Sequence, residues 1–398
     1  MVAMRSSLIG ALLASSGCCL TVVSGHGTTG RACVRGSASN LAGDAVYTTP
    51  PLFGIASADL NGDGLLDLVA TQFVVSPGTE LLVFFGQSDG GLTAPIPYDG
   101  STGHAIALGD LDGDGKPDLV VSNLSVPGIK VFLNDGAGGL HLQAPVATAR
   151  PVEGIAIGDL NGDGVADLLL AEFVGTVPSA ELLFGKGSGS FSAPVALPNL
   201  GGTLWGGVLI ADLNQDGLPD IVANAGDGGT LAVLLNQGDG GFETSYYPTR
   251  VLGQLALMPG ATGAPDLVLG NADPNAFLDG GATFIGEVQL LRNSGRGTFS
   301  IGPSYTAPGG LTLAIGDFNG DCSPDIATSS FGAAPTEPAT WGISVLYGDG
   351  QGGFEPAVSL QATSQTPGFL AVLGPVDSPR ALAVGSTGLT VYGDASQH

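Results

Sequence analysis

Five segments of the chain repeat one acidic pattern of nine residues. They are 59–67, 110–118, 159–167, 212–220 and 317–325, each with Asp at positions 1, 5 and 9 and Asp or Asn at position 3. A turn-forming residue stands near position 6. Hard cations such as Ca²⁺ take six to eight oxygen ligands, which alternating carboxylates on a tight turn supply. Five copies exclude chance, so the pattern indicates calcium-binding loops, here called acidic loops one to five, in a repeat architecture.

The charge of the chain is concentrated in these loops. The formal net charge is −25, with 36 acidic residues against 11 Lys and Arg, and the five loops contain 16 of the 36. So acidic a surface repels phosphate backbones and anionic lipids, which excludes nucleic acids and anionic membranes as expected partners. Hydrophobic residues make up 43% of the chain, which is ample for a large core.

Residues 1–25 are typical of an export signal. Arg5 precedes a short apolar run, 8–14, and then small residues. Cys18 follows a segment similar to a bacterial lipobox, but Ser15 stands where Leu is usual, so a lipid anchor at Cys18 and plain cleavage both stay open. We expect a linker over 26–42, a tail over 395–398, no transmembrane helix, and a secreted or cell-envelope location.

Two cysteines remain after the signal segment. An oxidising compartment permits a disulfide between Cys33 and Cys322. Two free thiols are the alternative, and the sequence leaves both open.

The spacing of the acidic loops defines the repeat. Successive loops start 51, 49, 53 and 105 residues apart, so one repeat without acidic ligands lies in the last gap. It is recognisable at 257–267, and a seventh repeat is visible near 369–384. The sequence therefore predicts seven repeats of roughly 52 residues, of which the fifth and seventh have no acidic loop and are expected to be metal-free.

Each repeat reads as four short strands. In the third repeat these are 154–158, 167–171, 181–184 and 191–197, with a glycine turn before the last strand. Four strands repeated seven times predict an all-β, seven-bladed β-propeller over residues 43–394. The seventh repeat ends after its third strand, and 44–50 matches the missing fourth. We therefore expect the N-terminal strand to complete the last blade and close the ring.

Loop, turn and period together resemble the FG-GAP/VCBS repeat proteins, the seven-bladed propeller family that includes the integrin α-subunit head. The resemblance covers about 43–394 and implies Ca²⁺ in the loop between the first two strands of a blade. Position 7 ligates through its carbonyl in this family. The implied ligands are Asp59, Asn61, Asp63, Leu65 and Asp67; Asp110, Asp112, Asp114, Lys116 and Asp118; Asp159, Asn161, Asp163, Val165 and Asp167; Asp212, Asn214, Asp216, Leu218 and Asp220; and Asp317, Asn319, Asp321, Ser323 and Asp325. Cys322 replaces the usual glycine in loop five, which implies a strained backbone and weaker binding there.

The alternative for these loops is a set of Asx turns without an ion, because Asp and Asn favour such turns. Three uncompensated carboxylates converging on one turn would repel each other, which favours the metal. Protein oxygens fill the expected shell, so we expect about five structural calcium sites and no catalytic metal.

The sequence predicts no enzyme. It has no nucleophile elbow, zinc-protease motif or phosphate-binding loop. Two long connections, 271–287 with Phe277 and Phe284 and 329–342 with Phe331 and Trp341, suit a contact with protein or sugar, or else fold back over a blade edge.

We therefore expect an exported, calcium-binding, monomeric propeller that acts as a protein- or glycan-binding or adhesion module at the cell surface. The alternative is a carbohydrate-active protein, either a lectin or a lyase-type enzyme, on the same scaffold. A purely structural envelope component is a third hypothesis.

Overall fold

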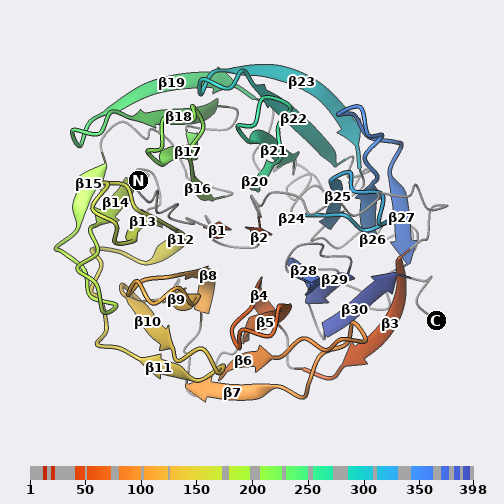
Figure 1. The fold of residues 1–398 in the computed structure, drawn as a ribbon, viewed down its shortest axis with the longest axis horizontal. Helices are drawn as coiled ribbons and strands as arrows, with labels where there is room; N and C mark the ends of the chain where they lie inside the picture. The colour runs from red at the N-terminus through yellow and green to blue at the C-terminus, as the bar shows by residue number, and fades with distance from the viewer. Residues whose placement is uncertain are drawn as a thin grey trace, which may run out of the picture.

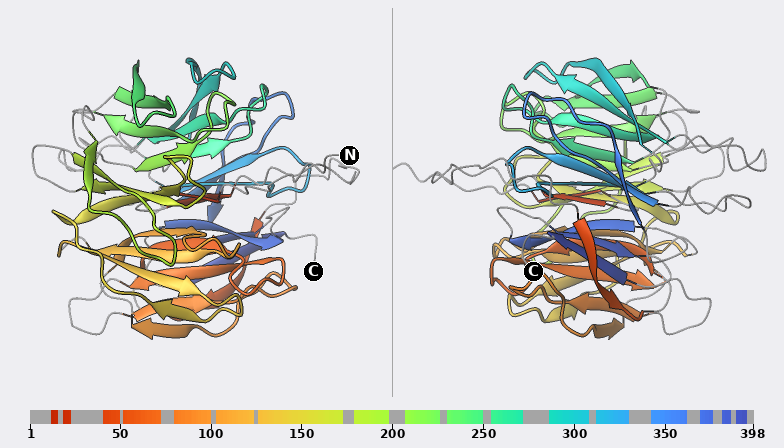
Figure 2. Two further views of the ribbon diagram at one scale, coloured as in Figure 1. Left: turned by 60° about the vertical axis from the view of Figure 1, so that its left-hand side comes forward. Right: turned by 90° about the vertical axis from the view of Figure 1, so that its right-hand side faces the viewer.

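The computed structural model describes residues 12–15, 19–22, 41–49, 52–72, 80–99, 103–123, 126–172, 179–197, 207–225, 230–249, 254–271, 286–307, 312–329, 342–361, 369–375, 381–385 and 389–394. These residues form strands and turns, with no helix among them. The sheets are arranged radially around a central axis (Figure 1), and Figure 2 shows the same ring from the side. The prediction of an all-β propeller built from four-stranded blades is confirmed.

Repeats two to six each form a separate, antiparallel four-stranded sheet. The first two strands of each sheet flank the acidic loop or its counterpart. In chain order the strands are β8 (Gly103–Gly109), β9 (Asp118–Asn123), β10 (Ile129–Asn134) and β11 (Leu140–Leu142); β12 (Val152–Gly158), β13 (Asp167–Glu172), β14 (Ser179–Leu183) and β15 (Val195–Leu197); β16 (Val208–Ala211), β17 (Asp220–Ala225), β18 (Thr230–Asn236) and β19 (Phe242–Pro248); β20 (Leu255–Met258), β21 (Asp266–Asn271), β22 (Glu287–Asn293) and β23 (Phe299–Thr306); and β24 (Thr312–Gly316), β25 (Asp325–Ser329), β26 (Gly342–Leu346) and β27 (Val358–Gln361).

The remaining long strands belong to one eight-stranded sheet. They are β4 (Leu52–Ala58), β5 (Leu65–Gln72), β6 (Glu80–Phe84) and β7 (Ile96–Asp99) of repeat one, β28 (Phe369–Pro375), β29 (Ala381–Gly385) and β30 (Leu389–Asp394) of repeat seven, and β3 (Leu41–Tyr47). The expectation of seven separate sheets is therefore corrected to five four-stranded sheets and one of eight strands. The physical reason is a short bridge, because the end of β28 pairs with the start of β5 at two positions.

The N-terminal strand β3 begins slightly earlier than the sequence predicted. It covers 41–47 rather than 44–50 and pairs antiparallel with β30. Within the predicted export signal, β1 (Leu12–Ser15) and β2 (Cys19–Val22) pair with each other near the centre of the ring (Figure 1).

Burial falls from the axis of the ring to its rim. Every residue of β16, β20 and β24 is buried, whereas the outer strands β19 and β23 are mostly half-buried or exposed. Inner strands therefore read as continuous apolar runs, because neighbouring sheets cover both of their faces. The sheets also approach closely: a Cβ on Gly158 would lie 2.6 Å from Ile210 Cγ2 of the next repeat. A side chain at Gly158 would push the two sheets apart.

Candidate metal centres in the acidic loops

The ninth residue of each acidic loop is an aspartate buried near the start of the second strand. All five have 0% exposed surface: Asp67, Asp118, Asp167, Asp220 and Asp325. In each, Oδ2 accepts a hydrogen bond from the backbone N–H of loop position 2 at 2.8–2.9 Å. Oδ1 accepts one at 2.8 Å from a backbone N–H at the end of the third strand. This carboxylate ties the loop to its sheet from two sides.

The side chains at positions 1, 3 and 5 fold onto the backbone of their own loop. The first aspartate accepts a hydrogen bond from the N–H of position 6 at 2.8–3.1 Å in all five loops. The third side chain accepts from the N–H of position 5 at 2.8–3.2 Å. The fifth accepts from the N–H of position 7 at 2.8–3.0 Å. A carboxylate has about four acceptor sites, so these bonds orient the oxygens and leave lone pairs for a cation.

The residues at position 7 are the predicted carbonyl ligands Leu65, Lys116, Val165, Leu218 and Ser323. Their backbone N–H groups bond the aspartate at position 5, as described above. Ligation by their carbonyl oxygens stays a prediction.

Positive backbone φ angles turn the chain inside each loop. Position 6 has φ between +83° and +86° in loops one to four, where it is glycine. Cys322 adopts φ +65° at this position in loop five, and Gln215 adopts φ +66° at position 4 of loop four. A residue with a Cβ is strained in this region. The strain predicted at Cys322 is therefore confirmed, whereas that at Gln215 was not anticipated.

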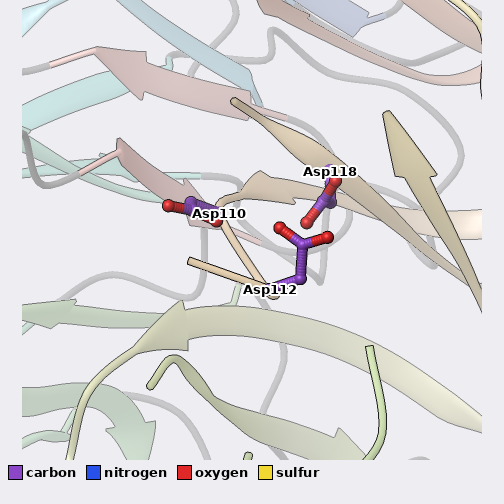
Figure 3. Close-up of side chains that lie close together, drawn as sticks. All are labelled: Asp110, Asp112 and Asp118. Atoms are coloured by element: carbon purple, nitrogen blue, oxygen red, sulfur yellow. The ribbon is translucent and has the colours of Figure 1, made fainter. Parts of the chain in front are cut away.

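Loop two shows the convergence of ligand atoms most directly. One carboxylate oxygen from each of Asp110, Asp112 and Asp118 lies within 4.8 Å of the others. Figure 3 shows the carboxylates of Asp112 and Asp118 facing each other, with Asp110 alongside. Calcium–oxygen bonds are roughly 2.3–2.6 Å long, so two ligands on opposite sides of one ion are about 5 Å apart. The three oxygens thus fit around a single Ca²⁺, and the donors are all hard oxygens.

Burial makes the position-9 aspartates difficult to ionise without a cation. Burial, reinforced by the neighbouring loop carboxylates, raises the pKa of Asp67, Asp118, Asp167 and Asp220 to about 6. The same causes raise the pKa of Asp325 to about 7. A divalent ion among these carboxylates would favour their charged forms. The electrostatics of the loops therefore fit the predicted metal.

Loop two differs from the others in carrying its own cation. Asp112 replaces the asparagine found at position 3 elsewhere, which adds a fourth acid. Lys116 Nζ lies 2.9 Å from Asp114 Oδ2 and donates to the carbonyl of Asp135 at 3.0 Å. The hydrogen bond from Lys116 lowers the pKa of Asp114. In loops one, three and four the Nδ2 of the asparagine at position 3 donates instead to Oδ2 of the aspartate at position 5.

Repeat five retains only the ninth aspartate of the pattern. Asp266 is buried, and its Oδ1 accepts a 2.7 Å hydrogen bond from the backbone N–H of Asn293. Its Oδ2 is 2.7 Å from Arg292 Nη1, and Arg292 Nη2 also donates to the carbonyl of Gly352 in a turn of the next repeat. A guanidinium thus compensates the carboxylate here. Sequence reasoning missed this role, although Arg292 is a basic residue in a chain that has few.

Three asparagines at the ends of third strands were also missed as structural residues. Their side chains hydrogen-bond the acidic loop of the preceding repeat: Asn134, Asn236 and Asn293. Their shared position before each glycine turn was the available signal.

Some predicted features lie outside the described residues. They include Cys18 and the aromatic residues Phe277, Phe284, Phe331 and Trp341. Cys322 is disulfide-bonded. Its pairing with Cys33 stays a prediction, because Cys33 also lies outside the described residues.

Comparisons with known proteins support the repeat assignment. Residues 59–121 and 110–170 match the model of the FG-GAP-like repeat. No curated protein matches the chain. Among solved structures, the fold is similar to that in "Crystal structure of BBS1N in complex with ARL6DN, soaked with lead", with a TM-score of 0.50, 13% identity, and 89% of this chain and 94% of that chain covered. A chain of the Photorhabdus luminescens Tc holotoxin pore matches at a TM-score of 0.35 and 14% identity, covering 82% of this chain and 16% of that one. The chain is therefore a β-propeller protein whose residues 59–170 match FG-GAP-like repeats.

Proposed function

We propose that the five acidic loops bind Ca²⁺ as structural ions and that the propeller serves as a binding module. The observation that carries the proposal is the loop-two cluster, in which three carboxylate oxygens lie close enough to share one ion. Loops one, three, four and five repeat its buried ninth aspartate and its internal hydrogen bonds. When bound, the ion would neutralise carboxylates that burial otherwise keeps partly protonated.

The proposal includes seven blades in a closed ring. The eight-stranded sheet contains two sets of four consecutive antiparallel strands, β4–β7 and β28, β29, β30, β3. Within the described part of the chain, backbone pairing joins the two sets at only two positions. We treat each set as one blade, which brings the total to seven.

Tyrosine contacts between neighbouring sheets support β3 as the outer strand of the last blade. Tyr247 of β19 and Tyr305 of β23 each accept a hydrogen bond from a phenylalanine N–H in the next repeat. Tyr47 of β3 likewise bonds Leu92 of repeat one, accepting from its N–H at 2.7 Å and donating to its carbonyl at 3.1 Å. Strand β3 thus contacts repeat one as an outer strand contacts the following blade.

In this proposal the chain is exported, acts by binding rather than by catalysis, and presents loops to an extracellular protein or glycan. A rigid scaffold with variable loops suits recognition. The similar fold of BBS1N was solved in complex with ARL6DN, which supports a binding role for this architecture. The export signal read from residues 1–25 supports the location.

Metal analysis and partner screening test the proposal. The purified protein should contain about five calcium ions per chain by elemental analysis, and Asp114→Ala should remove one. A glycan array and a screen of purified envelope proteins should then give a partner that is bound with Ca²⁺ and lost with a chelator. A metal-free protein overturns the calcium assignment, and turnover of a polysaccharide overturns the non-catalytic role.

A further inference from the structure

Asn134, Asn236 and Asn293 connect neighbouring repeats through buried side chains. Each is 2–5% exposed. The Nδ2 of each donates at 3.0–3.1 Å to the carbonyl of a proline in its own repeat, which stands at position 8 of the acidic loop or of the corresponding segment. The same Nδ2 donates at 2.7–2.9 Å to the carbonyl at position 2 of the preceding acidic loop. Each asparagine therefore holds two loops that are far apart in sequence.

These bonds continue into the ligand sets on both sides. Leu60, whose carbonyl accepts from Asn134, donates its N–H to Asp67 Oδ2 in loop one at 2.8 Å. The backbone N–H of Asn134 donates to Asp118 Oδ1 in loop two, also at 2.8 Å. Asn236 links Leu160 of loop three with Asp220 of loop four in the same way. A short chain of hydrogen bonds thus runs from one buried ligand to the next.

The connection is absent in three of the repeats. Glycine occupies the asparagine position in repeats one, three and six: Gly86, Gly185 and Gly348. The backbone N–H of each glycine makes the same bond to the ninth aspartate at 2.8 Å. A glycine has no side chain to reach the preceding loop. The asparagine bridge therefore joins loop one to loop two and loop three to loop four, but it does not join loop two to loop three.

We propose that Asn134 and Asn236 couple calcium binding in pairs, so that filling one loop of a pair raises the affinity of the other. An ion that orders loop one fixes the Leu60 carbonyl against Asn134, whose backbone holds Asp118 in place for loop two. By thermodynamic linkage, an ion in loop two then raises the affinity of loop one by the same factor. The inference rests on the proposed calcium binding and adds how the sites act together.

A double-mutant cycle tests the coupling. The stabilisation by calcium is measured as the free energy of urea unfolding at 2 mM Ca²⁺ minus that in chelator. For loops one and two the variants are Asp63→Ala, Asp114→Ala and the double variant. Each variant should lose part of this calcium stabilisation. The losses of the two single variants should sum to more than the loss of the double variant, by an amount equivalent to about a fivefold change in affinity. For loops two and three, tested with Asp114→Ala and Asp163→Ala, the losses should simply add.

Asn134→Gly isolates the bridge, since glycine is native at this place in three repeats and keeps the N–H bonded to Asp118. In the Asn134→Gly protein, the losses of calcium stabilisation caused by Asp63→Ala and Asp114→Ala should simply add. Asn236→Gly, tested with Asp163→Ala and Asp216→Ala, provides an independent second pair if Asn134→Gly does not fold. Equal coupling in bridged and unbridged pairs, or coupling unchanged by the glycine variants, overturns the inference. An absence of any calcium stabilisation in the unmodified protein would instead refute the proposed function, and the coupling with it.

Discussion

Acidic loop two and the corresponding segment of repeat five deal with the same buried charge in two ways. Asp118 and Asp266 occupy equivalent places at the start of a second strand, and both accept a backbone hydrogen bond from the asparagine that ends the third strand. Around Asp118, further carboxylates gather on a turn with positive φ angles. Around Asp266 those ligands are gone and Arg292 provides the positive charge. Both repeats keep the buried acid; Arg292 compensates it in repeat five, and in our proposal Ca²⁺ compensates it in loop two.

Removal of calcium should lower the thermal stability more than any of the substitutions below, and it should act only through the acidic loops. At 2 mM Ca²⁺ and an affinity of about 0.1 mM, each site contributes about 1.8 kcal/mol. With five sites, a chelator should lower the melting temperature by about 10 °C or more. Calorimetry with and without chelator measures this change. A shift of only one or two degrees would contradict the proposal that calcium compensates the buried aspartates of the acidic loops.

Arg292→Leu should remove the charge compensation in repeat five. Leucine is native at this place in repeats two and four, as Leu133 and Leu235. The substitution leaves Asp266 buried without its ion-pair partner, and because Arg292 is partly exposed we expect a loss of about 2–4 kcal/mol. Urea unfolding should give the same loss with calcium and with chelator.

The double variant Arg292→Leu/Asp266→Asn is the control for that prediction. Removing the buried charge as well should recover part of the stability. No recovery would mean that Arg292 acts mainly by packing and by its bond to the Gly352 carbonyl.

The pH dependence of stability should change sign with calcium. The pKa of four ninth aspartates is raised by burial from 3.8 to about 6, and that of Asp325 to about 7. Without calcium the native state therefore binds more protons than the unfolded state between the ordinary pKa of 3.8 and the raised values of about 6 to 7. The stabilisation from these protonated aspartates is complete below the ordinary pKa and is lost as the pH rises to between 6 and 7. With calcium, protons compete with the ion, and its stabilisation should fade as the pH falls.

Melting curves at pH 5.0 and 7.5, with calcium and with chelator, check this prediction. The chelated protein should melt higher at pH 5.0, whereas the calcium-dependent increment should be larger at pH 7.5. A chelated protein that is more stable at pH 7.5 would show that the buried aspartates do not control the titration.

The smallest expected effect is at the lysine of loop two. Lys116→Leu removes a cation that competes with calcium for Asp114, and leucine is native at position 7 in loops one and four. Both groups of this ion pair are partly exposed, so the calcium affinity of loop two should rise only about two- to fivefold. Lys130→Leu, in the same sheet but outside the loop, controls for net charge in calorimetric titrations. An equal rise in both variants would assign the effect to overall charge.

Sequence patterns predicted the repeats and the acidic loops because their determinants are local. Asx residues and glycines at fixed spacing set the turns, and apolar runs set the inner strands. The Arg292–Asp266 pair and the asparagine bridges were not predictable in this way, since they join residues 26 to 80 positions apart in the chain. The bridge between β28 and β5 was missed because it depends on how two neighbouring sheets meet at their edges.

The pairing of β3 with β30 has a consequence for the order of folding. The partners Tyr47 and Leu389 are separated by almost the whole propeller. Individual sheets can form as their own strands become available, but this last ladder must wait until the far strand has emerged. A nascent chain would therefore keep β3 unpaired until late, and closing so long a loop is slow. Segment 41–47 thus needs shielding from other chains during synthesis, because an unpaired strand can pair with another chain.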